Sequence, residues 1–381
     1  MMIMKKVLFL PFLQISSGHH QVADSLRDGL RELDPAIECD KVDILHYGYG
    51  RIERMISAIY LKWIDSFPQV YSWIYRKIVV GGQDEEKRYR HYEWLFIRII
   101  EDLLTEKQPD LIVCTHALPS YLLGRLKERK KLSTPVVNVY TDYFIHQLWG
   151  TRNVEFHFVP SLRMKEYLLK KGITENRIFV TGIPVHRKFS PVKDQPHQGR
   201  TKLNLMMTGG NLGVGLMENF VARVKNESIQ YRVLCGKNQA LYQRLNELHH
   251  SNVTPIPYIS SREEMDSLYE TCDGIITKPG GVTISESLFK RVPIFVYHTL
   301  PGQEELNMEQ LQNLGLANSF QTWQSNQNFE NMLVKFFKDD NTILRYNQKL
   351  DQYHASLEPE PPEELLYHLG TVPHSISALT R

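Results

Sequence analysis

The chain has 381 residues, of which 42% are hydrophobic and 23% are charged, and its formal net charge is +2. This composition is that of a soluble globular protein with full hydrophobic cores, and the length predicts two or three domains. A net charge so close to zero excludes a strong general attraction to nucleic acid. The four cysteines are far apart and form no C-x-x-C pair, which excludes a zinc site of that type and a disulfide framework. Reduced, cytosolic thiols are the simplest interpretation.

Residues 1–15 resemble a signal peptide, because lysines precede an apolar run. No small-residue cleavage site follows, so a buried first strand over 7–12 is the better interpretation. A glycine-containing loop over 14–20, a helix over 21–33 and a strand over 36–42 complete a βαβ start, which indicates an α/β domain. No apolar run approaches ~18 residues, so no transmembrane helix is expected.

The segment 51–80 interrupts this alternation. It holds six aromatic residues and five Lys or Arg against two acidic residues, and its apolar residues recur at helical spacing. Basic, aromatic, amphipathic helices are candidates for a membrane interface or a lipid acceptor groove, with Trp63 and Trp73 in contact with the lipid. The alternative is that the aromatic stripe packs on the sheet, which is the commoner use of such a pattern. Both interpretations remain open.

Strands and helices alternate through the rest of the chain, in two halves. The predicted domains are an acceptor-binding domain over 1–190, a polar linker over 191–201, a sugar-nucleotide domain over 202–340, a helix over 341–357 that crosses back to the first domain, and a loosely ordered tail over 358–381. Two α/β domains create a cleft between them, which is a preferred place for ligands.

A strand, a glycine turn and a helix are predicted around Lys278–Glu286. Glycines let a backbone approach a ligand and expose its N–H groups, and a helix that begins near Thr283 directs its positive end to the same place. The pattern predicts a phosphate site. In the alternative interpretation Thr283–Glu286 is a capping box with Thr283 as the N-cap, and the turn binds no ligand.

A second polar turn, Pro301–Asn307, follows the next strand. In a parallel sheet the loops after successive strands lie at one edge, where ligands bind, so this turn strengthens the prediction of a site. The loop after the first strand of either half lacks the G-x-G-x-x-G pattern, and Gly236-Lys237-Asn238 lacks the spacing of a P-loop. Dinucleotide oxidoreduction and ATP hydrolysis are therefore poorly supported.

Six short motifs in chain order resemble one enzyme family. They are Ser17–Ala23, Thr141–His146 with Trp149, Thr181–Pro184, Cys235–Asn238, Lys278–Glu286 and Pro301–Asn307. As an ordered set over roughly residues 5–350 they are specific. The chain is similar to GT-B fold glycosyltransferases of family 28, in particular to the diacylglycerol glucosyltransferases of Gram-positive bacteria and the plant monogalactosyldiacylglycerol synthases. The resemblance implies two facing Rossmann-like, doubly wound α/β domains with a cleft between them.

The resemblance also implies a nucleoside-diphosphate sugar donor, usually UDP-linked, held mainly by the second domain. Glu286 would bond the ribose hydroxyls, the glycine turn and the loop after the first strand would face the diphosphate, and the second turn would approach the sugar. The implied donor-binding residues are Gly210, Asn211, Lys278, Gly280, Gly281, Val282, Thr283, Glu286, Gln303, Glu304 and Asn307.

His19 matches the family's candidate catalytic histidine. Transfer with inversion needs a base that takes the proton of the acceptor hydroxyl, and an imidazole has a suitable pKa near neutrality. His20 is a rival for this role, and a loop histidine bonded to backbone is the alternative. Asp142 and His146 are implied to orient the base or the acceptor, although Asp142 fits a cap of the following segment equally well.

The acceptor is implied to bind in the first domain, near Gly18, His20 and Trp149, with Trp63 and Trp73 toward the membrane. Trp149 is either an acceptor platform or ordinary packing. The family's first loop is commonly richer in glycine, whereas here two serines precede Gly18. The backbone has less freedom in consequence, so the acceptor geometry need not match the family's.

No Asp-x-Asp triplet occurs in the chain. The departing diphosphate is therefore expected to be stabilised by backbone amides and the helix end at Val282, with no metal and no cofactor beside the UDP-sugar substrate. The expected reaction is inverting transfer of a hexose from a UDP-sugar to a lipid hydroxyl, with 1,2-diacylglycerol favoured. The expected partners are the UDP-sugar, the lipid acceptor and a membrane surface, but no nucleic acid. The expected location is the cytoplasm, in peripheral association with the cytoplasmic membrane.

Three alternatives remain open from the sequence. One is the same donor chemistry on a polyprenyl-linked or soluble acceptor. Another is a nucleotide-sugar epimerase of the same fold, which needs no acceptor. The third is a non-catalytic nucleotide-sugar-binding protein.

Overall fold

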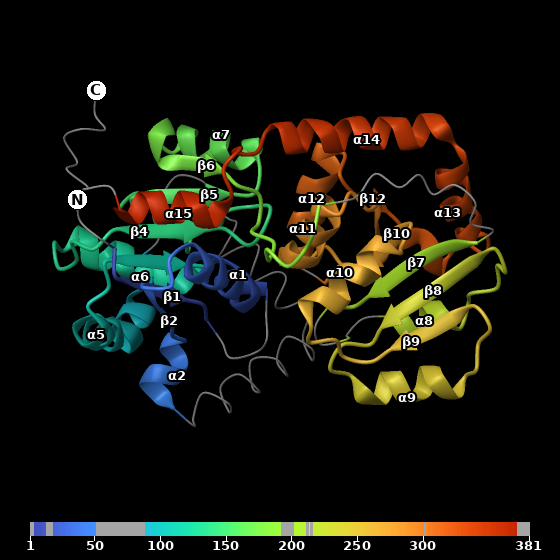
Figure 1. Cartoon of the computed structure of the whole chain (residues 1–381), viewed down its shortest axis with the longest axis horizontal. Coiled ribbons are helices and arrows are strands. Elements are labelled where there is room, and N and C mark those ends of the chain that lie inside the picture. The colour runs from blue at the N-terminus through green and yellow to red at the C-terminus, as the bar shows by residue number, and fades with distance from the viewer. Residues whose placement is uncertain are drawn as a thin grey trace. The chain divides into compact units, whose positions relative to one another are not determined.

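The computed structural model describes residues 4–12, 18–50, 88–191, 202–210, 213, 216–300 and 302–371. The chain forms two compact units. Unit 1 comprises residues 1–186 and 356–381, and unit 2 comprises residues 187–355. Each unit contains one six-stranded parallel sheet with helices packed against it (Figure 1). The amphipathic segment predicted over 51–80, with Trp63 and Trp73, lies outside the described residues.

Unit 1 has the strand order β2-β1-β3-β4-β5-β6, and every described strand pair in it is parallel. Its strands are β1 (Lys6–Leu10), β2 (Glu38–Lys41), β3 (Leu111–Cys114), β4 (Val136–Val139), β5 (Phe156–Val159) and β6 (Ile178–Val180). Its helices are α1 (Gly18–Leu33), α2 (Ile44–Tyr49), α5 (Arg90–Lys107), α6 (Ala117–Glu128), α7 (Leu162–Lys170), the short 3₁₀ helix η2 (Glu175–Arg177) and α15 (Pro362–Thr371).

Both faces of this sheet are covered, which explains why its strands are almost continuously apolar. Leu8, Ile112, Val137 and Phe158 have at most 1% of their surface exposed. The direction in which strands are added reverses between β1 and β3, because the chain first adds β2 on one side and then β3 on the other. Such a switch point is where ligands bind in open α/β sheets.

Unit 2 has the strand order β12-β11-β10-β7-β8-β9, again with parallel pairs, and its switch point lies between β7 and β10. Its strands are β7 (Leu203–Thr208), β8 (Ile229–Leu234), β9 (Val253–Ile256), β10 (Gly274–Thr277), β11 (Ile294–Val296) and β12 (Asn318–Ser319). Its helices are α8 (Met217–Val221), α9 (Gln239–Glu247), α10 (Arg262–Glu270), α11 (Gly281–Phe289), α12 (Gln303–Leu314), η3 (Gln321–Gln324), α13 (Phe329–Lys338) and α14 (Asp340–Ala355).

Two helices begin earlier than the sequence predicts. Helix α1 already includes Gly18, His19 and His20, which were expected in a loop. Helix α11 begins at Gly281 with Gly280 as its N-cap, so the capping box with Thr283 as the N-cap is wrong. Helix α11 starts with only three residues between it and the end of β10 at Thr277, as a short βα connection requires.

The C-terminal part of the chain also differs from the expectation. Helix α14 belongs to unit 2, and the stretch expected as a tail contains α15, which packs on α1 in unit 1 (Figure 1). The absence of a side chain at Gly29 permits this close packing, since a Cβ there would lie 2.8 Å from Cγ of Glu363. Leu365 and Leu366 of α15 are buried, which explains why the helix is ordered despite the prolines before it.

The chain leaves unit 1 and returns to it at neighbouring points. In unit 1 the amide of Glu358 donates to the carbonyl of Val180 at 2.8 Å. In unit 2 both junctions lie against the carboxyl-terminal end of α11, where Lys290 Nζ donates to the carbonyl of Ser190 at 2.9 Å and His354 Nε2 lies 3.0 Å from the carbonyl of Leu288. Unit 2 is therefore an insertion whose two ends are held by one helix.

Candidate active site

His19 lies at the switch point of unit 1. Its Nδ1 is 2.8 Å from the carbonyl of Thr115, which follows β3, and 2.8 Å from the Thr141 hydroxyl, which follows β4. A carbonyl only accepts, so Nδ1 carries the ring proton in the neutral side chain, and Nε2 keeps the lone pair. The Thr115 hydroxyl in turn donates to the backbone carbonyl of His19 at 3.0 Å. The ring is thus fixed in the tautomer that a general base needs.

Burial lowers the pKa of His19, while the carboxylate of Asp142 and the hydrogen bond to Thr115 oppose this shift. The side chain is therefore neutral near pH 7 and able to accept a proton. Asp142 lies in the loop after β4, and no helix follows it, so the interpretation of Asp142 as a cap is not supported.

Two further histidines surround His19. The ring of His116 meets that of His19 edge to face, with centroids 4.8 Å apart, and its Nδ1 accepts from the amide of Leu118 at 3.2 Å, which caps α6. His146 similarly accepts at Nδ1 from the amide of Leu148 at 3.3 Å. Burial lowers the pKa of His146 to about 3 and that of His116 well below its usual value, so both are neutral.

The rival histidine, His20, lies in a different environment. Its Nε2 is 3.8 Å from Asp43, whose carboxylate caps α2. Trp149 is 7% exposed and packs on Tyr140, with ring centroids 4.5 Å apart. Of the two interpretations of Trp149, packing is the one that these contacts favour.

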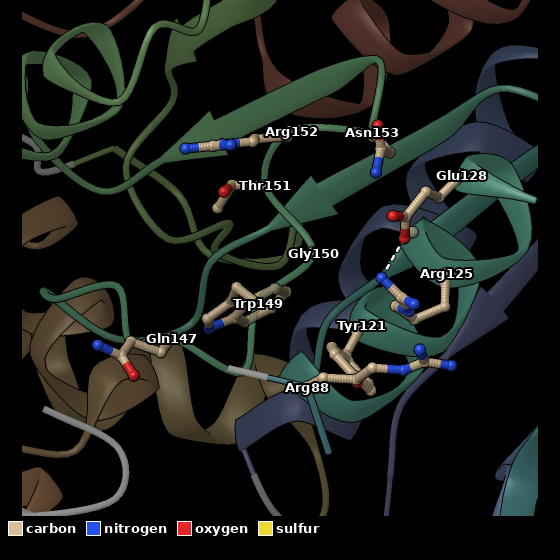
Figure 2. A pocket seen from close by; sticks show the side chains of 11 residues that line it. Arg88, Tyr121, Arg125, Glu128, Gln147, Trp149, Gly150, Thr151, Arg152 and Asn153 are labelled. Atoms are coloured by element: carbon tan, nitrogen blue, oxygen red, sulfur yellow. Dashed lines mark hydrogen bonds and ion pairs between the residues drawn. The ribbon is translucent and has the colours of Figure 1, made fainter. Parts of the chain in front are cut away.

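A pocket with a cavity volume of about 70 Å³ lies beside α6, between that helix and the loop that carries Trp149. The helix and the loop approach each other closely because Gly124 and Gly150, which meet there, have no side chains. Figure 2 shows the Arg125 guanidinium turned toward the carboxylate of Glu128, and the Arg152 side chain extending away from both. The arginines of this pocket therefore do not converge on a common point.

The switch point of unit 2 presents the amino-terminal end of α11. The N-cap, Gly280, offers no side chain, and the described residues contain no acceptor bonded to the amides of Gly281, Val282 and Thr283. A Cβ built at Gly280 meets no atom within 4 Å, so the space in front of this helix end is open. Free amides and the positive end of the helix dipole are groups suited to bind an anion.

Glu286 projects from the second turn of α11 and does not cap it. Its Oε2 accepts from the Tyr269 hydroxyl at 3.2 Å, and its Oε1 lies 3.8 Å from Arg262. Burial raises the pKa of Glu286 to about 7, against the opposing effects of Arg262 and Tyr269. Oε1 is the oxygen left to accept from a ligand.

The second turn is linked to the first by side chains. Asn307, 1% exposed, donates from Nδ2 to the carbonyl of Pro279 at 3.0 Å. Lys278 pairs with Glu304 at 3.0 Å, and the other carboxylate oxygen of Glu304 accepts from the amide of Leu300 at 2.6 Å. These contacts hold the glycine turn in place, while Gln303 is the first residue of α12.

The loop after β7 approaches the same switch point. Gly210 has a φ of +78°, and its amide donates to the Thr208 hydroxyl at 3.1 Å. Asn211 lies outside the described residues. The predicted donor residues thus gather at one edge of the sheet of unit 2, and His19, Asp142 and His146 gather at one edge of the sheet of unit 1.

The sequence did not single out Thr115, His116, Arg262 or Tyr269, and it included Thr141 only as the first residue of a motif, without a role. Thr115, His116 and Thr141 directly follow strands, but their meeting depends on β1, β3 and β4 being neighbours, and strand order is not readable from one sequence. Within the described ranges, three or more His, Cys, Asp or Glu side chains nowhere come together to hold a metal ion. Nor does any helix there combine the length and apolar character needed to cross a bilayer.

Comparison with known proteins identifies relatives of the whole chain. Residues 19–185 match the monogalactosyldiacylglycerol (MGDG) synthase family. The chain is 44% identical over 364 residues to the uncharacterized glycosyltransferase YkoN of Bacillus subtilis (strain 168), covering 95% of this chain and 96% of that protein. It is 30% identical over 323 residues to a processive diacylglycerol beta-glucosyltransferase of Bacillus cereus (strain B4264), covering 82% and 81%.

Solved structures show the same fold at low sequence identity. MurG of Acinetobacter baumannii superposes with a TM-score of 0.60 at 15% identity, covering 96% of this chain and 98% of that one. The MnaA–UDP structure of S. aureus gives 0.60 at 14% identity, covering 97% and 98%. Together with the two parallel α/β sheets, these relationships confirm the resemblance seen in the sequence: the chain belongs to glycosyltransferase family 28 and has the GT-B fold.

Proposed function

We propose that this glycosyltransferase moves a hexose from a UDP-sugar to the hydroxyl of a membrane lipid, with 1,2-diacylglycerol as the acceptor and inversion at the anomeric carbon. The observation that carries the proposal is the fixed tautomer of His19, whose Nδ1 is bound to the Thr115 carbonyl. A neutral imidazole with a free Nε2 is suited to take a proton from a hydroxyl. The relatives named diacylglycerol glucosyltransferases support a lipid as the source of that hydroxyl.

The proposed step is a single displacement. Nε2 of His19 takes the proton of the acceptor hydroxyl as its oxygen bonds to the anomeric carbon, and the bond from that carbon to the diphosphate breaks. The negative charge that develops on the UDP is stabilised by the amides of Gly281 and Val282 and by the dipole of α11. No metal and no cofactor is needed in this proposal.

The donor is bound in the proposal by the residues around α11. Oε1 of Glu286 accepts from the ribose hydroxyls, the Gln303 amide accepts from and donates to the sugar, and Glu304 accepts from it. Asn307 acts indirectly, since its amide is used to hold the Pro279 carbonyl. Cytoplasmic location and peripheral membrane association belong to the same proposal, because a soluble donor and a lipid acceptor must meet at the membrane surface.

The test is incubation of the full chain with labelled UDP-glucose or UDP-galactose and vesicles that contain diacylglycerol, followed by extraction of the lipid phase. The expected product is a labelled glycolipid with the β configuration, since UDP-hexoses carry the α configuration and the reaction inverts. Label that enters lipid with neither donor contradicts the proposal. Label that enters only a polyprenyl phosphate or a soluble alcohol shows that the acceptor belongs to that class and not to the diacylglycerols. Conversion of the UDP-sugar without any acceptor indicates an epimerase.

A further inference from the structure

Helix α5 carries the most exposed large apolar side chain in the part of the chain that the structure describes. Trp94 is 84% exposed, whereas Phe96, Ile100 and Leu103 of the same helix are buried in unit 1. A single exposed apolar residue is common on soluble proteins and needs no explanation. The surroundings of Trp94 are what make it informative.

Two arginines flank Trp94 along the helix. Arg90, Trp94 and Arg98 are spaced at i, i+4 and i+8, so they form one row on the helix surface. All three are exposed, as is His91 beside them. Among the described residues, neither Arg90 nor Arg98 takes part in an ion pair. We call these three residues the Arg90–Trp94–Arg98 row.

The acidic residue nearest to the row points elsewhere. Glu93 is 7% exposed and lies among Arg88, Arg129 and the hydroxyl of Tyr121, which donates to it at 3.0 Å. Along the row, the next acidic side chain is Asp102, one turn beyond Arg98. Glu101, three residues after Arg98, pairs with Lys131 at 2.7 Å, so among the described residues neither Glu101 nor Asp102 forms an ion pair with Arg90 or Arg98.

The helix that carries the row is packed firmly against the rest of unit 1. Helix α2 packs closely on α5, because Gly48 has no side chain where it meets Ile99, and the hydroxyl of Tyr49 donates to the carbonyl of Leu95 at 3.1 Å. The residues on the inner side of α5 are part of the core of unit 1. A helix held in this way presents its exposed side chains to a partner without rearrangement of the backbone.

We propose that the Arg90–Trp94–Arg98 row is a surface through which the protein docks on an anionic lipid bilayer. An indole ring prefers the headgroup level of a membrane, where its apolar body and its N–H are both accommodated. Arginines on either side bind lipid phosphates through paired N–H groups. The inference rests on the proposed lipid acceptor for its biological sense, and it names a surface distinct from residues 51–80.

The experiment measures binding of the full chain to vesicles of phosphatidylglycerol and phosphatidylcholine, by flotation at low and at high salt, without any donor sugar. Replacing both arginines by glutamine should weaken binding by about 25-fold, since each arginine near an anionic surface contributes about fivefold. Trp94→Ala should weaken binding several-fold, whereas Trp94→Phe should retain most of it. The matched control is Leu344→Ala on α14, where the side chain is 55% exposed without flanking arginines in this arrangement, and it should bind as the wild type does.

A second measurement locates the indole. Brominated lipids quench tryptophan fluorescence on contact, and Trp94→Phe should remove part of the quenching that the wild type shows. Circular dichroism checks that each variant is folded, which is expected because all three residues are exposed. Vesicle binding that is the same in the wild type, the double arginine variant and Trp94→Ala overturns the proposal, as does failure of the wild type to bind anionic vesicles. A change in self-association with unchanged vesicle binding assigns the row to contact between copies and also overturns it.

Failure of the docking surface and failure of the proposed function give different results. Transfer to diacylglycerol dispersed in detergent micelles needs no bilayer, so Trp94→Ala should retain it while losing transfer in vesicles. If the row determines vesicle binding but no variant and no wild-type protein makes glycolipid in either system, the proposed reaction is wrong and the docking surface stands.

Discussion

Burial has opposite effects on the pKa values of the two residues that are central to the proposed chemistry. It lowers the pKa of His19, which keeps the imidazole neutral and able to take a proton, and it raises that of Glu286 to about 7. An unperturbed carboxyl would be fully ionised near pH 7, so the environment of Glu286 makes its charge sensitive to pH and to ligand.

Removal of the His19 imidazole should separate binding from chemistry. For His19→Ala we expect an unchanged affinity for UDP in calorimetry and a turnover reduced by ~10²–10⁴-fold, which is the usual contribution of a general base. His20→Ala is the matched control, because the same ring is removed from the neighbouring position beside Asp43. A large loss of turnover in His20→Ala with full activity in His19→Ala means that the roles are exchanged.

The contact between His116 and His19 should be visible in the pH profile. His116→Ala opens one side of the His19 ring to water, so burial no longer lowers the pKa of His19 to the same extent, and the acid limb of kcat/KM should move to higher pH. His116→Phe keeps the ring packing, and its acid limb should stay close to that of the wild type. Equal profiles in all three proteins contradict a positioning role for His116.

Glu286→Gln should abolish one component of the pH dependence of UDP binding. The ionised carboxylate accepts ribose hydrogen bonds more strongly than the neutral acid, so wild-type affinity should rise as pH increases through about 7. The glutamine variant should bind about 1.5–3 kcal/mol more weakly above that pH. Titration of the UDP phosphate is common to both proteins and cancels in the ratio of their dissociation constants. A ratio that does not change with pH argues against contact between Glu286 and the ligand.

The same residue affects the stability of the unliganded protein with a defined sign. The pKa of Glu286 is raised from 4.5 to about 7 on folding, so its contribution is fully favourable below pH 4.5 and is lost as pH rises through 7. The loss is on the order of 3 kcal/mol, from 1.36 kcal/mol per pKa unit. Denaturant titrations of the wild type and Glu286→Gln should therefore differ more at high pH than at low pH.

At the scale of the element, the open end of α11 makes a prediction that separates ligand binding from folding. Gly280 has an ordinary φ of −79°, and a Cβ there meets no atom within 4 Å. Gly280→Ala should change stability by at most ~1 kcal/mol. It should nevertheless weaken UDP binding about tenfold or more, equivalent to 1.4 kcal/mol, if the diphosphate approaches this backbone.

Gly213→Ala is the contrasting variant for this experiment. Gly213 has a φ of +60°, and a Cβ there overlaps the carbonyl of Cys235, so the substitution should lower the melting temperature. Unchanged UDP affinity in Gly280→Ala, with the fold intact, removes the phosphate site from this helix end.

The helices and strands could be predicted from the sequence, but which of them lie next to one another in space could not. The apolar strands and the order of helices followed from periodicity, and the chain-order motifs led to the family. Helix starts were misplaced at Gly18 and Gly281, because glycine is normally a helix breaker, whereas here each is the first residue of a helix. The contact of His19 with Thr115 and Thr141 required the order of the strands, which one sequence does not contain.

At the scale of the whole molecule, the C-terminal helix belongs to the unit that carries His19. The sequence interpretation assigned 358–381 to a tail because of Pro359, Pro361 and Pro362, and it missed that Leu365 and Leu366 are buried. No local pattern connects residues this far from the first domain, so the packing of α15 on α1 was not predictable from spacing.

Loss of α15 should destabilise one unit and spare the other. A chain truncated after Ala355 exposes the face of α1 that α15 covers, and unit 1 should lose about 3–6 kcal/mol from the two buried leucines alone. Calorimetry should show a lowered transition for unit 1, while UDP binding persists. Gly29→Val, which overlaps Glu363, should shift the same transition in the full chain. A single transition that moves as a whole contradicts independent units.

Helix α11 connects the glycine turn of unit 2 with the two ends of that unit. Its nine residues extend about 14 Å at 1.5 Å per residue, from the open amides at Gly281 to Leu288 and Lys290, where both crossings of the chain are held. A helix of this length moves as a rigid element. A ligand that tilts α11 from its amino-terminal end should therefore shift Ser190 and His354 together, and with them both stretches of unit 2 that continue into unit 1.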